Sequence, residues 1–113
     1  MLHKFADKRK HDRLQLNLKV CERESGGVLG LTENIHCEGM KLISVKPFKD
    51  GETIQVVIEL PGVGETKKLV LTAQSCWSAP DNEPLVYNVG FRFLYSSPEL
   101  KKFYETLFDG LGE

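Results

Sequence analysis

Hydrophobic and polar residues alternate along most of this chain, and the alternation predicts short β-strands. Between residues 14 and 21, leucine or valine occupies every even position, and most odd positions are polar. A period of two is typical of a strand with one buried face. Five further strands are predicted at residues 28–32, 40–44, 53–60, 66–77 and 86–94. The run at 53–60 is rich in β-branched residues, and those at 66–77 and 86–94 alternate, the last with a register shift near Gly90.

Glycine, proline and asparagine separate these runs and predict reversals of the chain. Ser25-Gly26-Gly27 predicts a hairpin turn, and residues 34–39 predict a second turn because Asn34 and Gly39 tolerate positive φ. Prolines and glycines also interrupt the pattern at 47–51, 61–64 and 79–84. Six short antiparallel strands at this spacing predict a mainly β fold, a small six-stranded antiparallel β-barrel.

Only the carboxyl-terminal end has the pattern of a helix. Ser96-Ser97-Pro98-Glu99 combines a capping serine, an early proline and a glutamate placed for a capping box. Apolar residues then recur at helical spacing, namely Leu100, Phe103, Tyr104, Leu107, Phe108 and Leu111. We expect this stripe to pack on the barrel as core. A homodimer face is the alternative if the barrel cannot cover all of it.

The size and charge of the chain favour one small ligand-binding domain. A chain of 113 residues is sized for a single core. The first thirteen residues carry five basic and two acidic side chains, a net +3, and the remainder carries ten and fourteen, a net −4. A basic arm on an acidic body favours a small anion over a nucleic acid with a long footprint. We divide the chain into a flexible basic arm at 1–8 and a folded domain at 9–113.

The cysteines and histidines predict neither disulfides nor a metal site. Cys21, Cys37 and Cys76 are widely spaced and form no Cys-x-x-Cys pair. The three histidines have no spacing that brings two of them to one ion, so no metal or cofactor is expected. No apolar run has the length of a membrane span or the features of a signal peptide. We expect a cytoplasmic protein with reduced cysteines.

Catalysis is not expected from these residues. A nucleophilic Cys37 would need a base beside it, and the side chain of His36, its neighbour in sequence, should point away. Trp77, Phe91 and Phe93 are interpreted as core rather than as a platform for stacked bases, since aliphatic residues share their sheet faces. The chain is therefore predicted to be a binding protein and not an enzyme, with nucleic-acid binding the weakest alternative.

Lys8, Arg9 and Arg13 form the most basic stretch of the chain, directly before the first predicted strand. Two arginines four residues apart would present two planar guanidinium groups. Each of these can hold a phosphate or the O6 and N7 edge of a guanine. The simplest alternative is a solvated basic arm without a ligand. The ligand interpretation predicts an anionic target that carries guanine.

The two arginines are followed about twenty residues later by Asn34-Ile35-His36-Cys37-Glu38-Gly39. These two motifs, the strand order and the trailing helix resemble the PilZ domain family of bacterial receptors for cyclic di-GMP. The first family motif is two arginines separated by three residues. The second is Asp or Asn, any residue, Ser, any two residues and Gly. It is matched here at its first and last positions, whereas His36 stands at the serine position.

The resemblance implies a cyclic di-GMP receptor that changes conformation on binding and signals to an unidentified protein partner in trans. Arg9 and Arg13 would clamp phosphate and guanine, and Lys8 would add positive charge. Asn34 would hydrogen-bond a guanine edge, and Gly39 would let the backbone turn close to the ligand. Cyclic di-GMP would be the ligand, and no cofactor is implied.

His36 leaves two outcomes open. Imidazole is bulkier than a serine hydroxyl, but it can donate to a phosphate or stack on a purine. We expect retained binding, because the arginine pair and Asn34 are present. The alternative is a degenerate PilZ domain that binds no nucleotide and serves as a protein–protein interaction adaptor.

Overall fold

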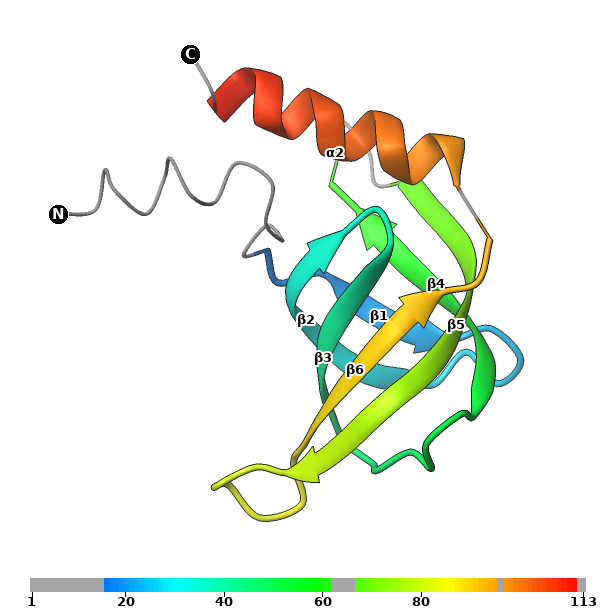
Figure 1. The fold of residues 1–113 in the computed structure, drawn as a ribbon, viewed down its shortest axis with the longest axis vertical. Coiled ribbons are helices and arrows are strands. Elements are labelled where there is room, and N and C mark those ends of the chain that lie inside the picture. Colours follow the sequence, from blue (N-terminus) through cyan, green and yellow to red (C-terminus); the bar gives the residue numbers. More distant parts are fainter. Residues whose placement is uncertain (1–15, 62–66, 96, 112–113) are drawn as a thin grey trace, which may run out of the picture.

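Six strands close into one antiparallel β-barrel in a computed structural model that describes residues 16–61, 67–95 and 97–111 (Figure 1). Around the barrel the strands follow the order β1-β2-β3-β6-β5-β4. Their bounds are β1 Lys19–Glu22, β2 Val28–His36, β3 Gly39–Ser44, β4 Thr53–Leu60, β5 Lys67–Pro80 and β6 Tyr87–Phe93. A helix, α2 Pro98–Leu111, follows the last strand. The predicted six-stranded barrel with a carboxyl-terminal helix is confirmed.

The interior of the barrel is one apolar cluster built from the inward positions of every strand. The period-two pattern is clearest in β4, where Val56, Ile58 and Leu60 are buried and the residues between them are not. Phe48, from the loop between β3 and β4, packs edge-on against Phe91 with ring centroids 5.1 Å apart. Burial of this set is the main source of stability, because each large apolar side chain contributes about 1.5–3 kcal/mol.

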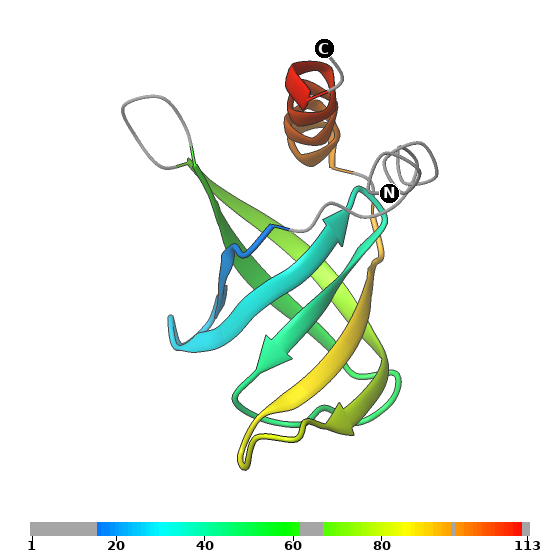
Figure 2. The same ribbon diagram turned by 90° about the vertical axis from the view of Figure 1, so that its left-hand side faces the viewer.

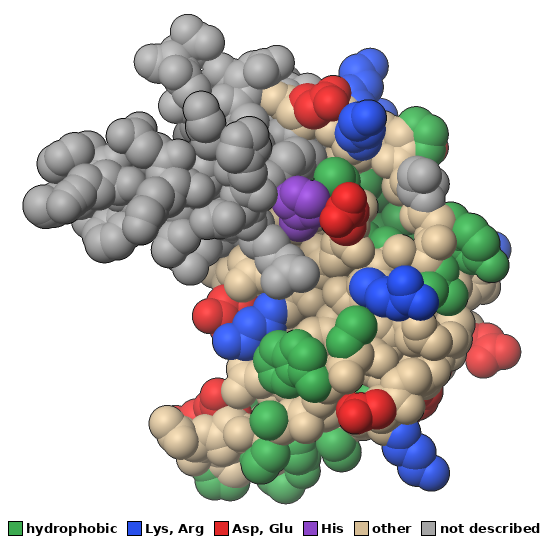
Figure 3. Space-filling model, in the orientation of Figure 1, with side chains coloured by type: hydrophobic (Ala, Val, Ile, Leu, Met, Phe, Trp, Pro, Cys, Tyr) green, Lys and Arg blue, Asp and Glu red, His purple; other side chains and the backbone are tan. Residues whose placement is uncertain are grey.

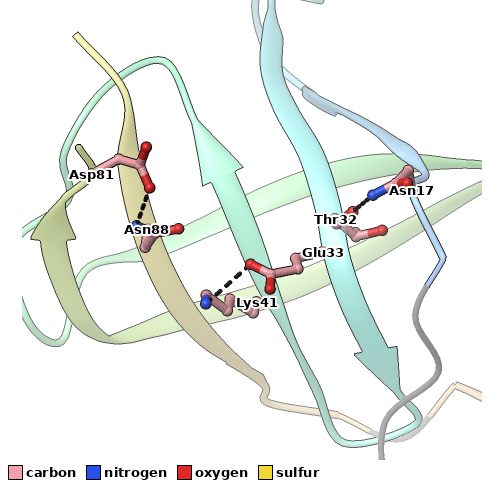
Figure 4. Close-up of polar contacts among 6 residues, drawn as sticks. All are labelled: Asn17, Thr32, Glu33, Lys41, Asp81 and Asn88. Carbon is pink, nitrogen blue, oxygen red and sulfur yellow. Dashed lines mark hydrogen bonds and ion pairs between the residues drawn. The ribbon is translucent and has the colours of Figure 1, made fainter. Parts of the chain in front are cut away.

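The first strand is shorter than its alternation predicted. β1 starts at Lys19, and residues 16–18 lie before it, although Leu18 is buried as the pattern required. The reason is a side chain on β2: the Thr32 hydroxyl accepts a hydrogen bond from Leu18 N at 2.8 Å and donates one to Leu16 O. Asn17 Nδ2 also donates to Thr32 O at 2.8 Å (Figure 4). Thr32 therefore holds this segment where a regular β ladder would otherwise continue.

The turn predicted at residues 34–39 is wrong in extent. Asn34 and His36 belong to β2, Gly39 begins β3, and only Cys37 and Glu38 form the turn between them. The expectation rested on residues that tolerate positive φ, but the pairing of His36 with Gly39 continues the ladder to the end of the hairpin. By contrast, the turn predicted at Ser25-Gly26-Gly27 is confirmed, and Gly26 has a φ of 77°.

The fifth strand runs past its predicted end and carries the irregularity expected on its neighbour. β5 continues to Pro80, three residues beyond the predicted limit at Trp77. The register shift lies on β5 between Ser75 and Trp77, opposite Phe91 and Gly90 of β6. The bulge thus belongs to the longer strand, and the prediction near Gly90 located the right place on the wrong partner.

Helix α2 lies over the end of the barrel where the β2–β3 turn is found (Figures 1 and 2). Ser97 is its N-cap: Ser97 Oγ accepts a hydrogen bond from Leu100 N at 3.1 Å. Glu99 is therefore in the first turn but does not stand at the capping-box position. Leu100 is buried and Phe103 packs against the core, as predicted. The remaining stripe residues, Tyr104, Leu107, Phe108 and Leu111, lie outside the side chains that the structure describes.

Replacing Thr32 with valine should destabilise the barrel while preserving its shape. Valine fills the same volume but leaves Leu18 N and Leu16 O without their hydroxyl partner in a buried position. We expect a loss of about 1–3 kcal/mol in the free energy of unfolding, measured by urea denaturation. Thr53→Val, at the exposed start of β4, is the matched control and should change stability by less than about 0.5 kcal/mol. Equal effects of the two substitutions would contradict this role of Thr32.

Candidate functional site on the outer face of the barrel

The structure brings Asn34, His36 and Gly39 together on the outer face of the β2–β3 hairpin. Asn34 pairs with Lys41 across the two strands, and His36 pairs with Gly39. Ile35 and Met40, which alternate with these residues, are buried in the core. Because successive side chains of a strand point to opposite faces, the motif residues point away from the core. Figure 3 shows basic, acidic and hydrophobic side chains and a histidine on this side of the molecule.

Asn34 has a side-chain atom without a partner. Its Oδ1 is buried, yet it accepts no hydrogen bond from any part of the chain that the structure describes. A buried amide oxygen without a donor costs about 1–3 kcal/mol, and such atoms in folded proteins usually have a partner. An N–H group of a bound molecule could supply the missing hydrogen bond.

His36 has a defined tautomer because of the turn that follows it. Its Nδ1 accepts a hydrogen bond from Glu38 N at 3.2 Å and lies 3.8 Å from Cys37 Sγ. A nitrogen that accepts a backbone N–H carries no proton, so the neutral ring bears its proton on Nε2. His36 therefore contributes an N–H donor at the position where the family pattern has a serine hydroxyl. Its contact with Cys37 also corrects the expectation that the two side chains point apart.

Figure 4 shows two polar pairs, one next to the motif residue Asn34 and one farther along β6. Lys41 Nζ lies 3.0 Å from Glu33 Oε1, so this cation is already neutralised within the protein. Asn88 Nδ2 donates to Asp81 Oδ1 at 2.9 Å. A hydrogen bond from the backbone of Glu83, followed by the one from Asn88, lowers the pKa of Asp81 below its usual range. Asp81 thus keeps its negative charge and orders the loop between β5 and β6.

Trp77 was interpreted as core, and the structure contradicts this. It pairs with Gly90 across β5 and β6, and 44% of its surface is exposed, whereas Phe91 and Phe93 are in the core as expected. The indole lies over Gly90: a Cβ added to that glycine would overlap the ring at Nε1 and Cε2. The bulge between Ser75 and Trp77 turns the side chain outward. An aromatic face is thus available on the same outer surface.

Lys8, Arg9 and Arg13 lie outside the described residues, so the meeting of the two motifs stays a prediction. The division into an arm at 1–8 and a domain at 9–113 is likewise untested. Residues 16–18, which follow the arginine motif, are fixed to β2 through Thr32, two residues before Asn34. The chain therefore enters the barrel close to the second motif.

Among the described residues, one groove opens at each of two ends of the barrel. One of about 600 Å³ lies between the β2–β3 turn and the start of α2, and Cys37, Glu38, Tyr95 and Lys101 are among its lining residues. The other, of about 470 Å³, is lined by Glu22, Arg23, Glu24, Lys46, Glu52, Thr53, Ile54 and Gln55. The second groove carries more acidic than basic side chains, which disfavours an anionic ligand there. The groove beside Cys37 is the one next to the motif.

The described residues contain no group of three His, Cys, Asp or Glu side chains that could hold a metal ion. In the same part of the chain, no helix has the length and apolar character needed to cross a membrane. Cys21, Cys37 and Cys76 are free thiols.

The sequence matches the family model of the PilZ domain over residues 7–109. This chain belongs to the PilZ domain family, whose members are receptors for cyclic di-GMP and nucleotide-binding modules rather than enzymes. The match includes the arginine motif and Asn34 to Gly39. No curated protein matches the sequence.

A solved structure with the same fold is the Bacillus subtilis inhibitor of motility, MotI/DgrA. The two structures superpose with a TM-score of 0.73 at 16% sequence identity. The superposition covers 88% of this chain and 49% of the neighbour, so the chain spans about half of that protein's length. At this identity the likeness supports the barrel fold alone.

Sequence reasoning missed two side chains of this face. Lys41 fell within the strand predicted at 40–44 and was given no role in the site, and Trp77 was assigned to the core. The pairing of β3 with β6 places Lys41 beside Gly90, over which the Trp77 indole lies. A glycine opposite a tryptophan can indicate an aromatic ring on the sheet surface, but only when the strand register is known. Here the bulge in β5 changes which residues are opposite each other.

Gly90→Ala should displace the Trp77 indole. The added methyl group would occupy the space of the ring, so the ring must move toward solvent. Trp77 is the only tryptophan in the chain, and its fluorescence emission should therefore shift to longer wavelength. Gly27→Ala is the control, because there a Cβ would meet only Ser25 Oγ, at 3.3 Å. An unchanged emission spectrum in Gly90→Ala would disprove the stacking of this ring on Gly90.

Proposed function

We propose that this domain binds cyclic di-GMP on the outer face of β2 and β3 and relays binding to a protein partner. The observation that carries the proposal is the Asn34 side chain in the second family motif, whose buried amide oxygen accepts no hydrogen bond from the described residues. The N1–H and N2–H groups of guanine are donors of the required kind. Membership of a family of cyclic di-GMP receptors supports the same ligand.

Each motif residue has a role in this proposal. Arg9 and Arg13 clamp phosphate and guanine from the amino-terminal side, with Lys8 adding positive charge. Asn34 accepts from a guanine edge, His36 donates through Nε2–H, and Gly39 leaves space beside the backbone. The segment that follows the arginine motif is fixed near Asn34 through Thr32, which supports the meeting of the two motifs in the bound state.

The output of binding is a changed surface. The arginine motif precedes the barrel in sequence, and a ligand that holds it against β2 and β3 would cover part of the outer face and present new side chains. A protein partner in trans would recognise this state. The Bacillus subtilis neighbour is described as an inhibitor of motility, and a regulatory output of that general kind suits a module that performs no chemistry.

Calorimetric titration with cyclic di-GMP tests the proposal. We expect a micromolar or tighter dissociation constant, a binding free energy of about −8 kcal/mol or better. Arg13→Ala and Asn34→Ala should each weaken binding, the arginine by roughly 10- to 100-fold, because it removes charge-assisted hydrogen bonds of about 1.5–3 kcal/mol. Arg23→Ala is the control, since Arg23 lies in the remote acidic groove and bonds to Gln55. Wild-type protein that fails to bind would refute the proposal.

His36→Ser separates a receptor from a degenerate domain. If His36 donates to the ligand, the serine variant should bind within roughly tenfold of wild type, because one neutral hydrogen bond is worth about 0.5–1.5 kcal/mol. The adaptor alternative predicts a different result, a silent wild type that gains nucleotide affinity when serine is restored. Both proteins should be titrated under identical conditions, with circular dichroism to verify that the barrel is intact.

A further inference from the structure

Arg92 lies in one row with the second motif. Gly39 pairs with His36 on one side and with Arg92 on the other, and Arg92 pairs in turn with Gln74 of β5. Directly paired residues point to the same face of a sheet. Arg92 is exposed, while Phe91 and Phe93 on either side of it are buried. Its guanidinium is therefore on the outer face that carries the motif.

The guanidinium of Arg92 is held in place by a short chain of hydrogen bonds. Arg92 Nε donates to Gln74 Oε1 at 3.0 Å, and Gln74 Nε2 donates to Gly51 O at 3.3 Å. Since Nε is used, the terminal edge with Nη1 and Nη2 remains for another acceptor pair. Within the part of the chain that the structure describes, neither nitrogen makes a hydrogen bond or an ion pair. A guanidinium edge of this kind binds two adjacent acceptors in a planar arrangement.

Gly39 lies between His36 and Arg92 in this row and is itself buried. Neighbouring strands are about 4.8 Å apart, so the backbones of His36 and Arg92 are separated by roughly 10 Å. Glycine has no side chain, so the strand between them adds no atoms to the outer face at this level. A bound group could therefore contact His36 and Arg92 on either side of Gly39 without meeting a side chain between them.

Electrostatics also distinguishes Arg92 from Lys41, another cation of this face. Lys41 Nζ forms an ion pair with Glu33 Oε1 at 3.0 Å. Breaking this ion pair would offset part of the binding free energy that a ligand could obtain from Lys41. Arg92 is hydrogen-bonded to a neutral amide and keeps its full charge for an anion. The guanidinium also loses less freedom on binding because Gln74 already orients it.

We propose that Arg92 is a third arginine of the cyclic di-GMP site, a role that rests on the proposed function and assigns to it a residue outside both motifs. Its terminal nitrogens bind two adjacent acceptor atoms of the ligand. Two sources offer that chemistry, the non-bridging oxygens of a phosphate and the O6 and N7 atoms of a guanine. Gly39 places no side chain between His36 and Arg92.

Calorimetric titration of Arg92→Ala and Arg92→Lys with cyclic di-GMP tests this role. The alanine variant should bind roughly 10- to 100-fold more weakly than wild type. The lysine variant should fall between the two, because it keeps the charge and loses the paired donors. Arg23→Ala is the matched control: Arg23 is also exposed and bonds to a glutamine at 3.0 Å, but in the remote groove, and its loss should change affinity less than twofold.

The acceptor pair is identified with an analogue of cyclic di-GMP in which 7-deazaguanine removes N7. If Arg92 binds the guanine edge, wild-type protein should bind the analogue more weakly than cyclic di-GMP. Arg92→Ala should bind the two ligands with nearly equal affinity. If Arg92 binds phosphate, the losses from the analogue and the substitution should add. Either pattern supports the role of Arg92 and assigns its acceptors.

The outcomes that overturn the inference are distinct from failure of the proposed function. Wild-type protein that does not bind cyclic di-GMP overturns both. If wild type and Arg92→Ala bind cyclic di-GMP equally well, only the role of Arg92 is overturned. The same holds if Arg92→Ala and Arg23→Ala lose equal affinity. Thermal unfolding of each variant controls for folding, and Arg92→Lys provides the comparison if the alanine variant is unstable.

Discussion

The register of the β2–β3 hairpin is the constraint on which the rest of the outer face depends. A two-residue turn at Cys37 and Glu38 pairs His36 with Gly39, and this pairing determines which residues of both strands face solvent. A slip by one residue would bury Asn34 and His36 and expose Ile35 and Met40, at a large hydrophobic cost. Core packing and the position of the motif are therefore set by the same register.

The closed barrel extends this register to strands that are distant in sequence. β3 pairs with β6, and β6 pairs with β5, so Gly39 of the motif lies beside Arg92 and in one row with Gln74. On β2, the Thr32 hydroxyl hydrogen-bonds to the backbone of Leu16 and Leu18. It thereby fixes the segment before β1 to the barrel. A rigid barrel thus organises an outer surface whose polar groups come from four strands, and a small ligand could contact several of them at once.

Much of the fold was predictable because its signals are local. The β-branched run at residues 53–60 predicted a strand with the observed bounds, and the glycines at 26–27 marked a true hairpin turn. Errors arose where a distant contact overrode the local pattern. Thr32 captures the backbone of Leu18 and shortens β1, and the bulge beside Trp77 turns an aromatic side chain from core to solvent. For the site, the second motif could be found by its residues, whereas Lys41 and Arg92 belong to no motif.

By itself, the sequence determined the alternating strands, the amphipathic helix, the basic amino-terminal stretch and the motif from Asn34 to Gly39, because each depends on residues close together in the chain. Tertiary structure decided which strands are neighbours and that the Arg92 guanidinium is oriented by Gln74. It also decided that the Asn34 amide oxygen is buried, with no donor among the residues that the structure describes. These features depend on pairings between residues up to 53 positions apart, such as Gly39 with Arg92. No local pattern specifies such pairings, because they follow from the closure of the whole barrel around its core.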